Sequence, residues 1–363
     1  MISWRGPGHP RAGGAELYTE RVLCGLAARG HRVTWLCEGG AAPGLSVVAR
    51  HGWLGLHLAA RRLLRAHPPG FEVAIDQINV LGFLTPLFSP VPVVALIHQR
   101  AAEVWRYDGP TLLRAVGPAL EAALLRCYRR VPFVTVSRTT LAELRERGWR
   151  GPGTLAFNGL DAPAPGAVPP AKEPGPTLVF LGRLGAASKR LPHALHAFAQ
   201  VRRSLPAARL WVIGRGVAPS RAPDGVTFHL GVSAARRDEL LARAWLLVAT
   251  SVREGWGRMV LEAAAAGTPA LVYAVPGLAE AAGAAAGACV APDPAALAAA
   301  ALALLAEPEA LHRRGRQARQ AVAGFTWDAA VEAWEAALHA AATPGRGPAG
   351  PAAPPPEPPA RGG

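Results

Sequence analysis

The strongest constraint on the fold is an alternation of short apolar runs with longer segments of helical spacing. In the second half of the chain, six runs have the length and composition of buried strands: residues 177–181, 209–213, 226–230, 246–250, 269–273 and 289–290. Helical patterns fall between them, at residues 191–204, 233–243 and 259–266. Alternation of this kind predicts a parallel sheet with helices on both faces.

The first half of the chain follows the same scheme. A helical pattern over residues 15–29 ends at Gly30, and strand-like runs follow at 31–36, 73–75, 91–97 and 133–136. Further helices are expected at residues 112–130 and 139–147. Only residues 1–4 are available for a strand ahead of Gly13 and Gly14. This strand is therefore short, or the true start lies upstream of Met1, and we favour the second interpretation.

Proline, glycine and alanine cluster at two places and divide the chain. We expect an N-terminal domain over residues 1–160, a linker over 161–176 and a C-terminal domain over 177–342. The last helix of this second domain is a candidate to pack back on the first. Residues 343–363 are predicted to be disordered, because their composition cannot bury a core. Because doubly wound domains bind ligands at the carboxyl ends of their strands, we expect the ligand site at those ends of the two domains.

The net charge of +14 has a mainly compositional origin. Of 39 basic residues only Lys172 and Lys189 are lysines, and the arginine excess accompanies abundant alanine, glycine and proline. Solvated arginine faces explain most of this charge, and an anionic partner (a lipid surface, a diphosphate or a nucleic acid) is the alternative.

The cysteines and the apolar segments bear on the cellular compartment. The four cysteines form no CxxC pair, which argues against a zinc ribbon, a redox motif or a disulfide scaffold and favours reduced thiols. The N-terminus lacks the apolar region of a signal peptide, and no run of about 20 apolar residues could span a membrane. The alanine-rich residues 295–306 are expected to form an ordinary helix. We therefore expect a cytoplasmic protein, with the inner face of the membrane as a candidate location.

The segment after the strand at 246–250 carries the clearest chemistry. Gly255 and Gly257 let the backbone approach a ligand, and the N–H groups that open the next helix suit a diphosphate. Glu262, about one turn into that helix, is placed to bind a vicinal diol such as a ribose. Glu254 could accept hydrogen bonds from sugar hydroxyls. Two solvated glutamates around an ordinary helix start are the simpler alternative.

Two cations follow the strand at 177–181. Arg183 and Lys189 precede a helix and could together bind a diphosphate and stabilise it as a leaving group, although Lys189 could also be an ordinary surface lysine. Residues 212–216 lack the third glycine of a dinucleotide motif, and Pro219 disfavours a helix start. A tight turn near the diphosphate is the better interpretation of these glycines.

These motifs, in this order, resemble those of family 4 glycosyltransferases of the GT-B fold. The matching segments are residues 182–184 with Lys189, 254–257 with 262–263, and 267–269, and in the first half 9–16, 30–34, 97–99, 135–137 and 158–161. The resemblance covers roughly residues 3–338 and implies two Rossmann-like doubly wound domains that face each other across a cleft. Three features depart from the family: Arg258 replaces an apolar residue, residues 185–188 are a weak match, and residues 39–53 are short.

The resemblance also implies a reaction. It is a retaining transfer from a nucleotide sugar, most often UDP- or GDP-linked, to a saccharide or lipid-linked acceptor, with no metal or other cofactor. The implied catalytic residues are Arg183, Lys189, Glu254 and His98, and the first two would neutralise the diphosphate in place of a metal. The implied nucleotide-sugar-binding residues are Gly13, Gly14, Gly182, Gly255, Trp256, Gly257 and Glu262. No carboxylate is identifiable as a nucleophile, which favours a front-face departure over a covalent double displacement.

Synthesis of an envelope polysaccharide or a glycolipid is the leading interpretation. A nucleotide-sugar epimerase of the same fold would need further acid–base groups in the first half, and none is identifiable. A basic nucleic-acid-binding protein fits the charge but lacks a zinc pattern and an RNP-like strand, so no nucleic acid is expected. The arginine-rich helix at 112–130 could rest on an anionic membrane or pack in the core, and we favour the core. No motif specifies the donor base, the sugar, the acceptor, the linkage or the oligomeric state.

Overall fold

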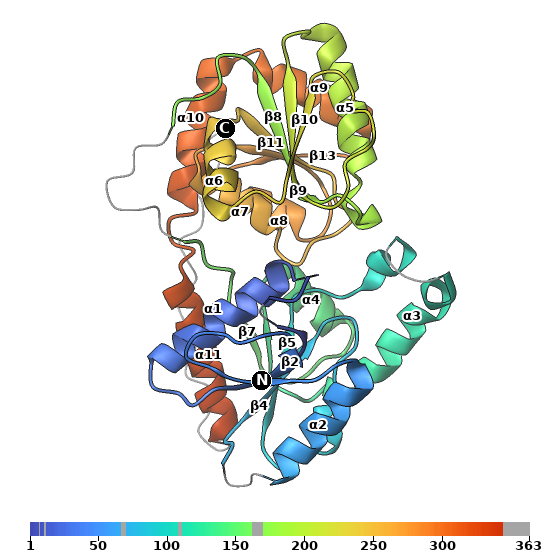
Figure 1. The fold of residues 1–363 in the computed structure, drawn as a ribbon, viewed down its shortest axis with the longest axis vertical. Coiled ribbons are helices and arrows are strands. Elements are labelled where there is room, and N and C mark those ends of the chain that lie inside the picture. The colour runs from blue at the N-terminus through green and yellow to red at the C-terminus, as the bar shows by residue number, and fades with distance from the viewer. Residues whose placement is uncertain (7, 11, 67–69, 108–110, 162–169, 344–363) are drawn as a thin grey trace. The chain divides into compact units, whose positions relative to one another are not determined.

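The computed structural model describes the chain except for residues 7, 11, 67–69, 108–110, 162–169 and 344–363. It divides into two compact units (Figure 1). Among the described residues, unit 1 comprises 1–102, 111–161 and 325–343, and unit 2 comprises 103–107 and 170–324. Residues 344–363 of the expected tail and residues 162–169 of the expected linker lie outside the described residues.

Unit 1 is built on a parallel sheet whose described part has seven strands in the order β3-β2-β1-β4-β5-β6-β7. They are β1 (Ile2–Arg5), β2 (Thr34–Glu38), β3 (Ser46–Ala49), β4 (Ala74–Ile78), β5 (Val93–Ile97), β6 (Phe133–Thr135) and β7 (Gly153–Leu155). A strand does precede Gly13 and Gly14, because the four residues of β1 pair with β2 and β4. Every residue of β5 is buried, as expected for a parallel strand that is covered on both faces.

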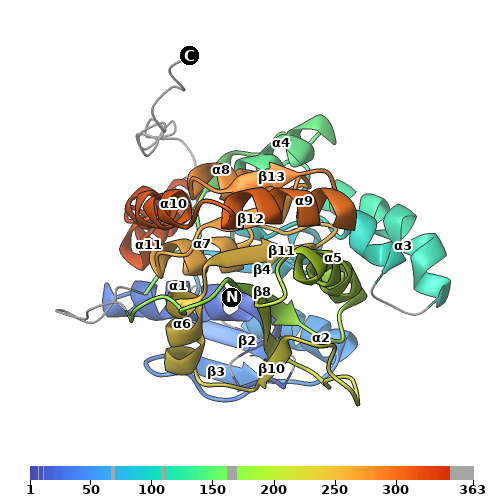
Figure 2. The same cartoon turned by 90° about the horizontal axis from the view of Figure 1, so that it is seen from above.

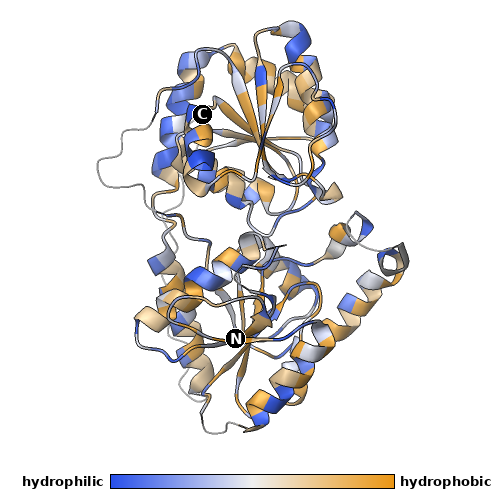
Figure 3. Ribbon diagram, in the orientation of Figure 1, coloured by the Kyte–Doolittle hydropathy of each residue, from blue (hydrophilic) through white to orange (hydrophobic). Residues whose placement is uncertain are grey.

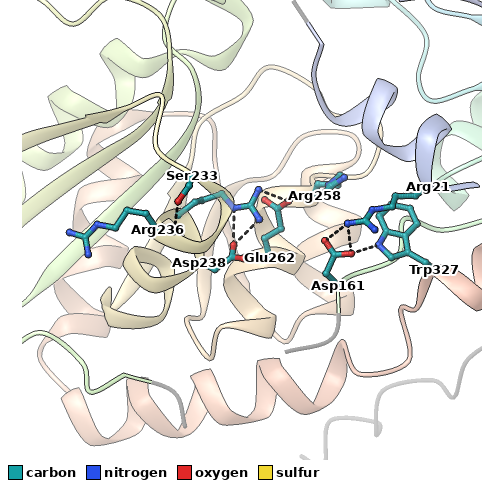
Figure 4. A network of polar contacts seen from close by, with 9 residues as sticks. Arg21, Asp161, Ser233, Arg236, Asp238, Arg258, Glu262 and Trp327 are labelled. Atoms are coloured by element: carbon teal, nitrogen blue, oxygen red, sulfur yellow. Dashed lines mark hydrogen bonds and ion pairs between the residues drawn. The ribbon is translucent and has the colours of Figure 1, made fainter. Parts of the chain in front are cut away.

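Two helices from opposite ends of the chain pack together in unit 1. Helix α1 (Gly14–Ala28) lies beside α11 (Trp327–Ala342), and the Trp334 indole donates a 2.8 Å hydrogen bond to the Tyr18 hydroxyl (Figure 1). Where the chain leaves and re-enters the unit, Asp161 accepts hydrogen bonds from Arg21 at 3.1 Å and from the Trp327 indole at 3.0 Å (Figure 4). These contacts make the last helix a part of unit 1.

The other helices of unit 1 are α2 (Trp53–Ala66), α3 (Thr111–Leu124) and α4 (Arg138–Glu146). The sequence patterns did not predict α2. The helix expected at 112–130 to pack in the core does so only in part: α3 ends at Leu124, and Tyr128 beyond it is buried in the core. Of residues 114–124 only Gly117 and Glu121 are buried, so α3 is a surface helix.

Unit 2 is built on a second parallel sheet, whose described part has six strands in the order β10-β9-β8-β11-β12-β13. The strands are β8 (Thr177–Arg183), β9 (Arg209–Arg215), β10 (Val226–Leu230), β11 (Leu246–Ala249), β12 (Ala270–Tyr273) and β13 (Ala288–Val290). The helices are α5 (Leu191–Ser204), α6 (Ala234–Arg243), α7 (Arg258–Ala265), α8 (Leu278–Ala284), α9 (Pro294–Leu305) and α10 (Pro308–Ala321). All six predicted strands of this half are present, and so are the helices predicted at 191–204, 233–243, 259–266 and 295–306.

The core of unit 2 lies between its sheet and two neighbouring helices. Helices α5 and α9 lie side by side (Figure 2) and bury Phe198 and Leu297 against Phe180 and Leu210 of the sheet. Apolar residues concentrate along the strands of both units (Figure 3). The two Rossmann-like parallel sheets confirm the predicted fold class.

Candidate active site

The predicted site residues of unit 2 lie where its strand order reverses. From β8 the sheet continues through β9 to β10 on one side, and from β11 it continues through β12 to β13 on the other. Open α/β sheets bind ligands at such switch points, because the loops that follow the two central strands diverge there. Gly182 and Arg183 end β8, and the loop that carries Glu254 follows β11.

Close packing between β8 and β9 explains the glycines of residues 212–216. A Cβ on Gly214 would overlap the carbonyl oxygen of Gly182, and Gly216 has a φ of +135°, which favours glycine. This segment is the end of a strand followed by a turn. Arg183 next to it is exposed, and its side chain makes no hydrogen bond or ion pair in the described part of the chain. Its guanidinium is therefore available to a ligand.

The turn that carries Lys189 is fastened to the end of β11. The buried Thr250 hydroxyl lies 3.0 Å from the carbonyl oxygens of both Lys189 and Arg190, and it can donate to either. The Val252 N–H donates to the Ser188 carbonyl at 2.9 Å. Arg190 has a φ of +49°, an uncommon value for a residue with a side chain, and the contacts to Thr250 hold it there. Two loops far apart in sequence are thus held in one fixed arrangement.

Lys189 and Glu254 are in direct contact. The Lys189 ammonium donates to Glu254 Oε1, and the Ser251 hydroxyl donates to the same oxygen at 2.6 Å. Only 17% of the Lys189 side chain and 15% of the Glu254 side chain are exposed. Such a pair offers a cation to a phosphate oxygen and a carboxylate to a hydroxyl, the two group types found in a nucleotide sugar.

The backbone around Glu254 leads directly into the N-terminus of α7. The Glu254 N–H donates to the Pro276 carbonyl at 3.0 Å, and a Cβ on Gly277 would overlap the Glu254 carbonyl. Gly257 caps α7 with a φ of +74° and provides no side-chain oxygen, while Trp256 is buried. The first N–H groups of α7 therefore have no side-chain cap and can bind an anion.

Glu262 lies in the second turn of α7, between two arginines (Figure 4). Arg258 Nη2 is 2.6 Å from Glu262 Oε1, and Arg237 Nη1 of α6 is 3.8 Å from the same oxygen. Only 12% of the Glu262 side chain is exposed. A ribose would have to share or displace these contacts, so the unusual Arg258 competes directly for the predicted ribose carboxylate.

The remaining predicted residues belong to unit 1. His98 follows β5, accepts a 3.1 Å contact from the Gln77 amide and meets the edge of the Tyr18 ring at 5.1 Å. Burial lowers the pKa of His98 to about 4, so the ring is neutral at physiological pH. Gly13 caps α1 and Gly14 begins it, and the Gly13 N–H already donates to Glu16 Oε2 at 2.7 Å. His98 and the N-terminus of α1 each follow the carboxyl end of a strand of the unit 1 sheet.

Sequence reasoning missed the residues that hold the site together. Thr250 and Ser251 stand at the end of a predicted strand. Two consecutive hydroxyl residues at that position were the feature of the sequence that could have indicated their role. Arg237 belongs to no motif, and only the folded structure brings it to Glu262.

Within the described ranges, no group of three or more His, Cys, Asp or Glu is arranged to hold a metal ion. No single described helix is long and apolar enough to cross a membrane, and only the bent pair α9 and α10 reaches the threshold jointly.

Comparisons with known proteins agree with this architecture. Residues 12–162 match the family model described as Glycosyltransferase Family 4, and residues 167–321 match Glycosyl transferases group 1. A glycogen synthase of Mycobacterium tuberculosis is 34% identical over 307 residues, which cover 79% of this chain and 67% of that protein.

Solved structures share the fold at lower identity. WaaG, a glycosyltransferase involved in lipopolysaccharide biosynthesis, has a TM-score of 0.68 at 19% identity, over 92% of this chain and 97% of that chain. HepE of Anabaena in complex with UDP-glucose has a TM-score of 0.68 at 15% identity, over 93% and 99% of the two chains. The chain therefore belongs to the family 4 glycosyltransferases of the GT-B fold, enzymes that transfer a sugar from a nucleotide-sugar donor.

Proposed function

We propose that this enzyme transfers a sugar with retention of configuration to a saccharide or lipid-linked acceptor of the cell envelope. The observation that carries the proposal is the contact of Lys189 with Glu254 at the β8–β11 switch point. Arg183 and Lys189 neutralise the diphosphate as its negative charge grows, and the N-terminus of α7 adds backbone donors. Glu254 accepts hydrogen bonds from the transferred sugar, and Glu262 accepts them from the ribose.

The acceptor attacks from the face that the diphosphate leaves. Within the described part of the site, Glu254 is held by Lys189 and Ser251, and Glu262 by Arg258, so neither carboxylate is free to attack the sugar. A phosphate oxygen of the leaving group can accept the acceptor's proton. Analysis of the product by NMR tests this, because a retained anomeric configuration is expected and inversion would contradict it.

The donor is proposed to be a UDP-sugar, with a GDP-sugar as the alternative. The support is indirect: the solved relative HepE was captured with UDP-glucose. Screening UDP-, GDP- and dTDP-sugars for hydrolysis and transfer by the purified protein tests this proposal. Turnover of none of them would contradict it.

A neutral glucan is a second candidate acceptor. It is favoured by the 34% identity to a glycogen synthase over 67% of that protein. Incubation with a radiolabelled UDP-sugar and either glycogen or extracted membrane lipids separates the two candidates by the fraction that becomes labelled.

We also infer that unit 1 contacts an anionic membrane at the cytoplasmic face. Leu54 and Leu58 of α2 are 62% and 47% exposed, and Arg61 and Arg65 continue the same helix face. An apolar stripe that continues into cations suits insertion at an anionic lipid surface. The L54S/L58S double variant should lose cosedimentation with phosphatidylglycerol vesicles. V217S, which changes an exposed valine of unit 2, should retain it. Equal sedimentation of all three proteins would contradict the inference.

A further inference from the structure

The carboxyl end of β5 in unit 1 carries polar groups that the protein itself leaves unsatisfied. Arg100 is only 8% exposed, and its side chain makes no hydrogen bond or ion pair in the described part of the chain. Next to it, Gln99 Oε1 is fully buried and receives no hydrogen bond from the described residues. A buried charge without a counter-charge is strongly unfavourable, so such an arrangement indicates a missing anionic partner.

A buried carboxylate, Glu121, contacts the backbone of the residue after Arg100 but does not neutralise the Arg100 guanidinium. Glu121 of α3 is 2% exposed and accepts a 2.9 Å hydrogen bond from the Ala101 N–H, yet it forms no ion pair with Arg100. The fold therefore brings a carboxylate to the residue after Arg100, and one of its oxygens accepts from the backbone there. The Arg100 guanidinium is left for a group outside the chain.

The surroundings at the same sheet edge also favour an anion with hydroxyl groups. Helix α4 begins there, and the Thr140 hydroxyl in its first turn donates to the His98 carbonyl at 3.3 Å. The positive end of this helix thus lies beside the strand that leads to Arg100. On the neighbouring strand, Thr135 pairs with Ile97, and its buried hydroxyl has no hydrogen-bond partner in the part of the chain that the structure describes. Gln99 and Thr135 supply the buried unpartnered side-chain atoms of unit 1 among the described residues.

We propose that Arg100 binds an anionic group, a phosphate or a carboxylate, of the saccharide acceptor, and that Gln99 accepts a hydrogen bond from one of its hydroxyls. This inference rests on the proposed transfer reaction and narrows its acceptor to a charged saccharide. A guanidinium discriminates strongly in favour of such a group, because it donates two parallel hydrogen bonds to one anion.

The test is calorimetric titration of the full-length protein with glucose 6-phosphate, glucuronate and glucose at saturating UDP. UDP occupies the cations of unit 2, so that phosphate binding there does not interfere. We expect at least one of the two anionic sugars to bind more tightly than glucose, and R100Q to weaken that binding at least tenfold. R50Q, which removes an exposed arginine of the same unit, should bind as the wild type does.

The outcomes separate this inference from the proposed function. If the wild type binds neither UDP nor GDP, the proposed function fails. If it binds UDP but does not prefer either anionic sugar to glucose, or if R100Q binds them as the wild type does, the role of Arg100 is wrong. UDP affinity unchanged in R100Q shows that the variant is folded. Q99L should weaken glucose 6-phosphate binding but not the binding of inorganic phosphate, and equal losses would remove Gln99 from the site.

Discussion

Lys189 and Glu254 come from loops after two different strands and meet as an ion pair that is nearly closed to solvent. The pair satisfies both charges before any donor arrives. When a nucleotide sugar binds, the ammonium can turn to the diphosphate and the carboxylate to a sugar hydroxyl. In the proposed mechanism, each charge would thus have one partner in the free enzyme and another in the complex.

Removing the Glu262 carboxylate should weaken nucleotide binding. Loss of a charge-assisted hydrogen bond to the ribose costs about 1.5–3 kcal/mol, so E262A should bind UDP roughly 10- to 150-fold less tightly in calorimetry. The preference among donor sugars should not change, because the ribose is common to them. An unchanged UDP affinity would reject the ribose assignment.

Removing Arg258 should have the opposite effect. Its guanidinium lies 2.6 Å from Glu262 and would compete with a ribose that this carboxylate binds. R258L should therefore bind UDP more tightly, by about the 1 kcal/mol that a displaced hydrogen bond is worth, or roughly fivefold. R236L removes an arginine of α6 that pairs with Glu239 and serves as the matched control. Weaker UDP binding in R258L would show that Arg258 contacts the nucleotide and does not compete with it.

The Thr250 hydroxyl should matter for catalysis although it is a positioning group. It holds the carbonyls of Lys189 and Arg190, so T250V should let the ammonium shift and lower kcat about tenfold or more. T250S keeps the hydroxyl and should restore most of the activity. A T250V enzyme with normal kcat would show that the turn is held by other contacts.

The pH dependence of stability follows from His98. Its folded pKa of about 4 lies below the ordinary value near 6.5. Between these values the unfolded chain binds a proton that the folded protein excludes, so stability rises with pH there and is lost as the pH falls below about 6.5. H98Q should flatten this dependence in urea unfolding at pH 5 and pH 7, and H51Q, at an exposed histidine, should not. Identical pH dependence of H98Q and wild type would contradict the cause given.

Turnover should not require a divalent metal, because Arg183 and Lys189 can neutralise the diphosphate. The activity should survive EDTA and should not rise on addition of manganese. Complete loss in EDTA, restored by manganese, would overturn this expectation.

The sequence predicted the sheet of unit 2 almost strand by strand, because its strands are continuous apolar runs separated by amphipathic helices. It was less successful with α2 and α3. An apolar stripe such as that of Val116 and Leu120, which are 47% and 38% exposed, looks the same on a core helix and on a surface helix. The periodicity of apolar residues therefore predicts that a helix forms, but it does not predict whether other elements of the protein cover its apolar face.

The candidate site divides in the same way. Glu254, Glu262, Arg183 and Lys189 could be named because their motifs place them at strand and helix ends. Their partners could not be named, since the Lys189–Glu254 contact and the approach of Arg237 to Glu262 depend on tertiary geometry. Arg100 was not noticed either, because an arginine in a chain with 39 basic residues stands out only once its burial is known.

The central claim is that Arg183 and Lys189 stabilise the departing diphosphate. The most direct measurement is kcat for R183A, K189A and the double variant with the best nucleotide sugar. Each single substitution should lower kcat roughly 10²–10³-fold, as for removal of one preorganised charge, and the double variant should lose less than the product because both groups act on one anion. K189R, which keeps the charge but changes its shape, should lie between wild type and K189A. Near-normal kcat in both folded alanine variants would contradict the account.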